Sequence, residues 1–135
     1  MNEPGDRRPI AARDWRPIRA AATWLVRQQA APNGISVAGM AAALLAGTLF
    51  ALIPAVPDKA RLLWACGAVL IQLRLLANVL DGMVAVGRGV ASRVGELFNE
   101  VPDRISDTAV LAGVGHAVGE PALGWAAALF AMLTA

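Results

Sequence analysis

Long apolar stretches follow one another along most of this chain. Residues 35–53 contain no charged side chain over 19 positions, and a helix of that length crosses roughly 30 Å of hydrocarbon. Further apolar stretches run from about 62 to 84, from about 99 or 104 to 118, and from 122 to 135. The pattern predicts an all-α, polytopic membrane helix bundle of about four spans.

The segment before the first span has a different pattern. From Pro17 to about Ala30, apolar side chains mix with arginines, which predicts a short amphipathic helix at the membrane interface that ends at Asn33 and Gly34. Six of the twelve basic residues precede the first span, so the positive-inside rule places the N-terminus in the cytoplasm. We therefore expect a cytoplasmic N-terminal segment with a juxtamembrane helix at 1–34 and a transmembrane bundle at 35–135, in the inner or plasma membrane.

Composition supports the membrane class and excludes several others. The chain is 57% hydrophobic and 16% charged, which favours an integral membrane protein over a soluble one. The net charge of +2 is too small to indicate nucleic acid as a partner. Cys66 is the single cysteine, so no disulfide framework is available. Zinc-ligand spacing, a Gly-rich phosphate loop and a Ser/His/Asp set are all absent from the sequence.

Small residues recur at helical spacing in two of the apolar stretches. Gly39, Ala43 and Gly47 repeat every four residues in the first span, and Gly115 and Gly119 form a second pair. Such positions let neighbouring helices approach closely. We interpret both sets as packing contacts between helices.

Polar residues concentrate between positions 78 and 107. On a helix, Asn78 and Asp81 would share one face with Arg74, and Glu96, Asn99, Glu100, Asp103 and Asp107 would share another. A carboxylate near the bilayer centre costs roughly 2.5–3.5 kcal/mol, so these acids point to function. Two acidic faces opposite one another predict a cation site. The alternative is structural: Asp81 and Asp103 pair with arginines to hold helices together, and Asp107 orients Arg104 or caps local structure.

The spacing of these residues resembles the signature of the CDP-alcohol phosphotransferase family, D-x-x-D-G-x-x-A-R-x8-G-x-x-x-D-x-x-x-D. The positions that match are Asp81, Gly82, Ala85, Gly95 and Asp103, and those that depart are Asn78, Val86 and Asn99. Ser92, the continuation from Asp103 to Asp107, and the segment from Ala31 to Ser36, which is similar to a T-P-N-x-I-T lead into the first membrane helix, add to the resemblance. The family usually has six membrane helices, so we expect this chain to lack the last two and part of the fourth.

The resemblance implies a reaction and a set of partners. A substituted phosphate, such as a phosphatidyl group, would move from a CDP-alcohol such as CDP-diacylglycerol to an alcohol acceptor, with release of CMP, in phospholipid biosynthesis. The partners would be the donor, the acceptor and the lipid bilayer, and a homodimer is compatible with the family. The resemblance also implies divalent cations, Mg²⁺ or Mn²⁺, two in number.

The resemblance assigns roles to individual residues. The metal ligands would be Asp81, Asp103, Asn78, Asn99 and Glu100, and the substrate-binding residues would be Gly82, Ala85, Ser92 and Gly95. Asp103 would also be the catalytic base for the acceptor hydroxyl.

The departures from the signature leave a second function open. An asparagine keeps an oxygen ligand but supplies no charge, and Glu96 and Glu100 could restore the two charges. Arg74, Arg88 or Arg104 could replace the cation that Val86 removes. The alternative function is that of a non-catalytic relative, which binds a nucleotide-lipid or a partner subunit without turnover.

Overall fold

The computed structural model describes residues 15–90 and 93–134, with side chains for 15–90 and 100–134. The described part is helical and contains no strand. Its α-helices are α1 (Arg16–Arg27), α2 (Pro32–Leu52), α3 (Ala60–Gly87), α4 (Arg93–Ala117) and α5 (Pro121–Leu133), and the short 3-10 turns η2 (Ile53–Ala55) and η3 (Pro57–Lys59) join α2 to α3. The predicted all-α membrane bundle is confirmed.

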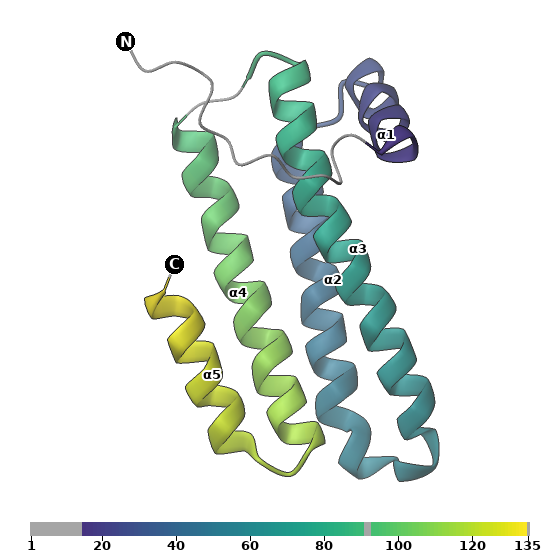
Figure 1. Ribbon diagram of the computed structural model, residues 1–135, viewed down its shortest axis with the longest axis vertical. Coiled ribbons are helices and arrows are strands. Elements are labelled where there is room, and N and C mark those ends of the chain that lie inside the picture. Colours follow the sequence, from purple (N-terminus) through teal and green to yellow (C-terminus); the bar gives the residue numbers. More distant parts are fainter. Residues whose placement is uncertain (1–14, 91–92, 135) are drawn as a thin grey trace.

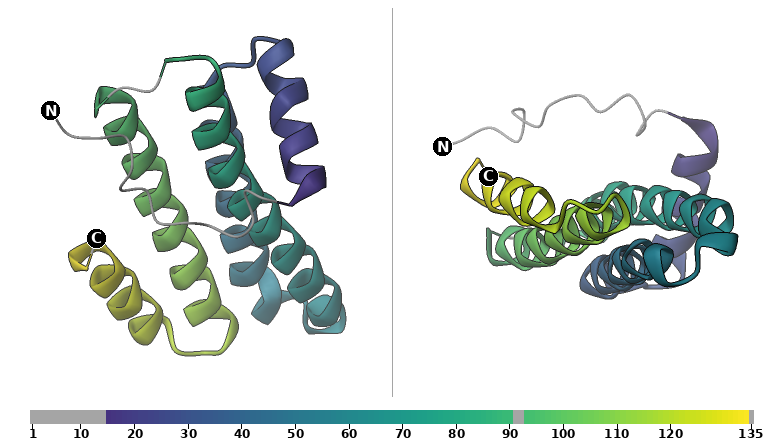
Figure 2. Two further views of the ribbon diagram at one scale, coloured as in Figure 1. Left: turned by 45° about the horizontal axis from the view of Figure 1, so that its top comes forward. Right: turned by 90° about the horizontal axis from the view of Figure 1, so that it is seen from below.

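Helix α2 is the centre of the bundle. It packs against α3 and against α4, while α5 packs on α4 and α1 packs on α3 (Figure 1). Two further views place α5 and α1 at opposite sides of the molecule (Figure 2). Within the described residues, no Cα atom of α3 lies within 8 Å of a Cα atom of α4. Helices α3 and α4 are therefore held together by α2 and by side chains that reach across.

The small residues of α2 explain why it can pack against two helices. A Cβ atom added at Gly39 would lie 2.8 Å from Ala77 Cβ on α3, and one added at Gly47 would overlap the backbone of Ala109 on α4. Ala43 between them is fully buried. The predicted close-packing role of this set is confirmed.

The predicted packing role of the second pair of glycines is confirmed for only one of the two residues. Gly115 packs against Gly124 of α5, where an added Cβ would lie 2.6 Å from the Gly124 Cα atom. Gly119 has φ +80° and open space around it, so it forms the turn between α4 and α5 rather than a helix contact. A residue in this left-handed region is favoured as glycine because it lacks Cβ.

Two helix boundaries differ from the sequence-based expectation. The amphipathic helix ends at Arg27, and Gln29 with φ 53° turns the chain, so Asn33 and Gly34 lie in the first turn of α2. Pro32 explains the shift, since its fixed φ suits the first position of a helix. The third long helix begins earlier than expected and contains Pro102 in its interior.

Two segments are long and apolar enough to cross a membrane. They are Pro32–Ala55 and Pro57–Gly87, and only 33% and 6% of their most apolar windows are buried inside the protein. Their outward apolar side chains suit contact with lipid. Helix α4 lies beside α2 and carries four charged residues between Glu100 and Asp107, and α5, which packs on α4, has 13 residues.

Candidate metal and phosphate site

A buried hydrogen bond joins α2 to α3 near one end of the bundle. Ser36 Oγ donates to Asp81 Oδ2 over 2.6 Å, and Asp81 is 2% exposed. Ser36 Oγ also lies 3.2 Å from the Pro32 carbonyl oxygen, one turn earlier in its own helix. Ser36 therefore fixes the orientation of the Asp81 carboxylate.

Ser36 had no role in the sequence-based site. The signal for it was present, because it stands at the last position of the segment that resembles T-P-N-x-I-T. The position of Ser36 within α2 does not by itself identify a hydrogen-bond partner that is 45 residues away in the sequence. Only the packing of α2 on α3 brings the two side chains together.

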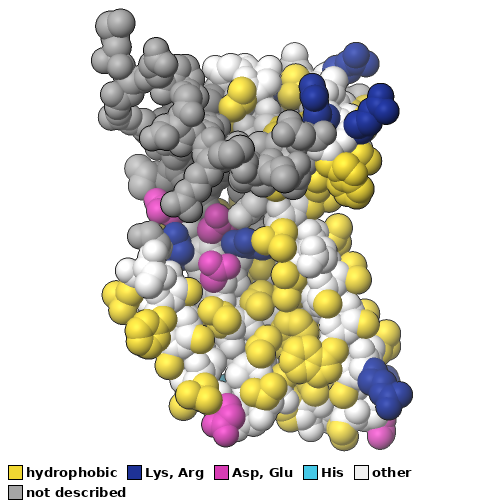
Figure 3. Space-filling view, in the orientation of Figure 1, with side chains coloured by type: hydrophobic (Ala, Val, Ile, Leu, Met, Phe, Trp, Pro, Cys, Tyr) yellow, Lys and Arg dark blue, Asp and Glu magenta, His cyan; other side chains and the backbone are white. Residues whose placement is uncertain are grey.

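Arg74 forms the second part of the site and spans the space between α3 and α4. Its Nη2 atom lies 3.2 Å from Asp103 Oδ1 and 3.2 Å from Asp107 Oδ1. The Arg74 side chain is 12% exposed, against 35% and 41% for the two carboxylates. Figure 3 shows acidic and basic side chains close together on this face, with many hydrophobic ones below them.

The two parts of the site are neighbours. Arg74 and Asp81 are seven residues apart on α3, which is about two turns and the same face. Asp81 therefore lies on the face of α3 that also carries Arg74, the partner of Asp103. A metal site shared by Asp81 and Asp103 stays a prediction.

Asp107 has a different partner from the one expected. The sequence suggested that Asp107 orients Arg104, but its carboxylate contacts Arg74. Arg104 instead donates from Nη1 to the Ala131 carbonyl oxygen of α5 over 3.3 Å, and its Nη2 atom lies 3.9 Å from Glu100 Oε1. The expectation for Asp107 failed because it assumed a partner on the same helix.

The other residues of the predicted site divide into three groups. Asn78, Gly82 and Ala85 lie on α3 within about one turn of Asp81 and are partly buried. Glu100 lies next to Arg104 and has a side chain that is 56% exposed. Ser92 lies outside the described residues, and Gly95 and Asn99 belong to the stretch of α4 whose side chains are not described.

The three candidate arginines differ in what they contact. Arg88 donates from Nη1 to the Ala30 carbonyl oxygen over 2.7 Å, which ties the end of α3 to the segment after α1. Arg104 is engaged with α5. Arg74 contacts Asp103 and Asp107. Which arginine, if any, replaces the cation missing at Val86 stays a prediction.

The donor set can be compared with the needs of a metal ion. Within the part of the chain that has described side chains, no three His, Cys, Asp or Glu residues gather in an arrangement that could hold a metal ion by themselves. Asp81 and Asp103 still supply hard oxygen donors from two helices, and the carboxamide of Asn78 is one turn from Asp81. Mg²⁺ binds proteins through one or two carboxylates, with water and phosphate oxygens completing its shell. These oxygen donors are of the chemical kind that a hard divalent cation shared with a phosphate would need.

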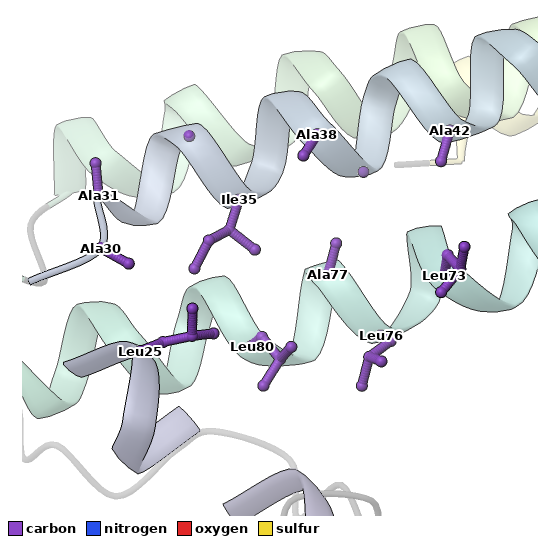
Figure 4. Close-up of a pocket in the computed structure, with 12 residues that line it drawn as sticks. Leu25, Ala30, Ala31, Ile35, Ala38, Ala42, Leu73, Leu76, Ala77 and Leu80 are labelled. Carbon is purple, nitrogen blue, oxygen red and sulfur yellow. The ribbon is translucent and has the colours of Figure 1, made fainter. Parts of the chain in front are cut away.

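An apolar groove of about 560 Å³ lies between α2 and α3 and extends to α1. In Figure 4, Ile35 and Ala38 of α2 face Ala77 and Leu80 of α3, and Leu25 projects from α1 at one end. Every lining residue is apolar or glycine. The groove therefore suits a hydrocarbon chain rather than a polar ligand.

Comparison with known proteins gives three informative relatives. The chain is 35% identical over 100 residues to the phosphatidylinositol phosphate synthase of Mycolicibacterium smegmatis, covering 73% of this chain and 40% of that protein. It is 32% identical over 105 residues to the phosphatidylinositol phosphate synthase of Mycobacteroides abscessus, covering 77% of this chain and 42% of that protein. It is 32% identical over 93 residues to the inner membrane protein YnbA of Escherichia coli, covering 69% of this chain and 44% of that protein.

The chain thus spans about two fifths of the length of the curated relatives it matches. No family model and no solved structure matches it.

Proposed function

We propose that this chain, which belongs to the CDP-alcohol phosphotransferase family, forms the catalytic part of a membrane-embedded phosphotransferase. The reaction moves a substituted phosphate, such as a phosphatidyl group, from a CDP-alcohol such as CDP-diacylglycerol to an alcohol, and releases CMP. The observation that carries the proposal is the contact of Arg74 with Asp103, on a face of α3 that also carries the buried Asp81, in a largely apolar bundle.

Each residue of the site has a role in this reaction. Asp81, held by Ser36, and Asp103 act as oxygen ligands for Mg²⁺ or Mn²⁺, with Asn78 and Asn99 as neutral ligands. Such a cation would supply positive charge to neutralise the oxygens of the diphosphate. Asp103 uses Oδ1 for Arg74, so its other oxygen is free of that contact and can accept the proton of the acceptor hydroxyl.

Arg74 completes the phosphate end of the site. Its guanidinium is already partly buried beside Asp103, and its Nε atom is buried without a hydrogen-bond partner among the described residues. A phosphate oxygen would satisfy that donor. The contacts of Gly82, Ala85, Ser92 and Gly95 with substrate stay predictions, as does a homodimer.

The apolar groove supports a lipid-borne donor. It is built from the same two helices as the Ser36–Asp81 hydrogen bond, and Ala77 and Leu80 precede Asp81 on α3. A hydrocarbon chain in the groove would hold the head group of the same molecule near the polar site. The groove thus accounts for a substrate that is apolar at one end and a diphosphate at the other.

The orientation in the membrane follows from α1. A side chain of α1, Val26, reaches Gly87 at the end of α3, where a Cβ would lie 2.9 Å from Val26 Cγ2. Since the arginine-rich N-terminal segment favours the cytoplasm, the site also faces the cytoplasmic side of the inner or plasma membrane in this proposal.

Release of CMP tests the function. The purified protein in lipid nanodiscs is mixed with CDP-diacylglycerol, Mg²⁺ or Mn²⁺ and a panel of alcohols. The panel includes inositol phosphate, the alcohol part of the phosphatidylinositol phosphate after which two of the relatives are named. We expect CMP release that Asp103→Asn abolishes and that Asp58→Asn, at the turn between α2 and α3, leaves unchanged. CDP-alcohol binding without CMP release would instead support the non-catalytic relative.

A further inference from the structure

Helix α1 has two faces that differ in what they contact. Its apolar face packs against the bundle: Ala22 is 5% exposed, and a Cβ added at Gly87 of α3 would lie 2.9 Å from Val26 Cγ2. Leu25, on the same face, lines the groove between α2 and α3. The apolar face of α1 is therefore used within the protein, and it is not left over for insertion into lipid.

The opposite face of α1 is basic. At about 100° per residue, Arg16, Arg19 and Arg27 fall within an arc of about 80°, and residues 16–27 include no acid. All three arginines are exposed, and none of them forms an ion pair with another described residue. Figure 3 shows basic side chains gathered at the corner of the molecule where Figure 1 places α1. These charges are therefore open to a partner from outside the chain.

The place of α1 in the bundle brings this basic face to the membrane surface. The segment Pro57–Gly87 is long and apolar enough to cross a membrane, and α1 packs against its last residue. Directly after it, Arg88 Nη1 donates to the Ala30 carbonyl oxygen over 2.7 Å. Trp24, one turn before Arg27, is 60% exposed, and tryptophan is enriched at the level of lipid head groups. Helix α1 thus lies at the depth at which a spanning segment ends.

We propose that the basic face of α1, formed by Arg16, Arg19 and Arg27, is a binding surface for the head groups of anionic phospholipids. The charges are complementary, since an anionic leaflet presents negative groups at the same depth. Arginine also matches phosphate oxygens in its hydrogen-bond geometry. Because the apolar face is occupied by α3, the attraction depends on lipid charge rather than on insertion. The inference does not rest on the proposed function, because this surface lies outside the polar site.

Hydrogen–deuterium exchange of α1 tests the inference without any turnover. The full chain is placed in nanodiscs of phosphatidylcholine alone or of an equal mixture with phosphatidylglycerol. Head groups bound to the arginines oppose the local opening that lets amides exchange, so the amides of 16–27 should exchange about tenfold more slowly in the anionic nanodiscs. The amides of α2 should exchange at the same rate in both. Equal rates for α1 in the two lipids would overturn the inference.

A triple variant and a matched control assign the effect to these side chains. Arg16→Gln combined with Arg19→Gln and Arg27→Gln should lose most of the slowing, because the exposed face is then neutral. Lys59→Gln combined with Arg61→Gln removes two exposed cations from the other end of α3 and should keep it. A folded triple variant that keeps the full slowing would overturn the inference.

Ionic strength gives a test on the wild type alone, which decides the matter if the triple variant does not fold. The Debye length falls from about 10 Å at about 0.1 M salt to about 3 Å at about 1 M. The slowing of α1 exchange by phosphatidylglycerol should therefore disappear at the higher salt concentration. A slowing that persists there would overturn the inference, since it would mean that lipid contact with α1 is apolar.

A soluble anion separates lipid head groups from free phosphate. Glycerol phosphate, added at millimolar concentration to the phosphatidylcholine nanodiscs, presents similar phosphate chemistry without a lipid anchor. It should leave the exchange of α1 unchanged, because it is not concentrated at the membrane surface. A slowing as large as that by phosphatidylglycerol would overturn the membrane assignment and indicate a site for a soluble phosphate compound.

Discussion

Ser36 Oγ donates a 2.6 Å hydrogen bond to Asp81 Oδ2, from the start of α2 to the last third of α3. Both residues are buried. A carboxylate in such a place needs a donor to keep one orientation. This contact links the packing of the first membrane helix to the geometry of the proposed metal ligand.

Replacing Ser36 should therefore impair activity and stability together. Ser36→Ala leaves a buried oxygen of Asp81 without this donor, which should cost about 1–3 kcal/mol in the free energy of unfolding. Loss of a group that orients a metal ligand typically lowers activity roughly 10–100-fold. CMP release and denaturant unfolding in detergent measure both effects.

Thr48→Ala is the matched control for Ser36→Ala. Thr48 is an exposed hydroxyl residue on the same helix, and its Oγ1 donates only to the Leu44 carbonyl oxygen among the contacts described. Its removal should leave CMP release unchanged. Equal losses in the two variants would mean that Ser36 acts through general helix stability, not through Asp81.

Gly47 should not tolerate a side chain. The Cβ of Gly47→Ala would overlap the backbone of Ala109, so α2 and α4 would have to separate. Overpacking of this kind costs typically 1–3 kcal/mol. A lower midpoint of thermal unfolding for the variant than for the wild type, measured in detergent, would show this loss of stability.

Gly34→Ala, on the same helix, should not destabilise the protein. Its Cβ would meet only Ala31 Cβ at 3.9 Å, an ordinary contact. Alanine stabilises a helix by about 1 kcal/mol relative to glycine, so the midpoint of thermal unfolding should stay the same or rise. A fall as large as that of Gly47→Ala would contradict the packing assigned to α2.

Asp107 and Asp103 should differ in their effect on turnover. Asp107→Asn removes a partner of Arg74 but no proposed ligand or base, so CMP release should fall by less than about tenfold. Asp103→Asn should abolish it. Equal loss in both variants, measured at saturating Mn²⁺, would show that Asp107 takes part in the chemistry itself.

Glu100 tests the sequence-based ligand set. Its carboxylate lies beside Arg104, so Glu100→Gln should leave the Mn²⁺ affinity within about threefold. Titration calorimetry measures the change. A tenfold or larger loss would restore Glu100 as a metal ligand.

Arg104 should stabilise the position of α5. Its guanidinium donates to the Ala131 carbonyl oxygen near the end of that helix. In Arg104→Gln, backbone amides of 121–133 should exchange with deuterium faster while those of α2 keep their rates. Unchanged exchange in α5 would mean that the Gly115–Gly124 contact holds the helix without Arg104.

The sequence by itself determined the helices, the small-residue face of α2 and the segment that is proposed to carry the chemistry. These features are local: apolar length, a four-residue repeat and the spacing of Asp81, Gly82, Ala85 and Asp103 are visible without knowing what packs against them. The tertiary structure decided the partners. Ser36 reaches Asp81, and Arg74 rather than Arg88 or Arg104 contacts Asp103 and Asp107.

The physical reason is that partner choice depends on how closely helices approach and how they are rotated about their axes. Gly39 and Gly47 set that approach for α2, and the resulting arrangement places Arg74 opposite Asp103 and Asp107. The same rotation turns Glu100 toward Arg104. Helical periodicity shows which residues share a face, but only the packed bundle shows what that face meets.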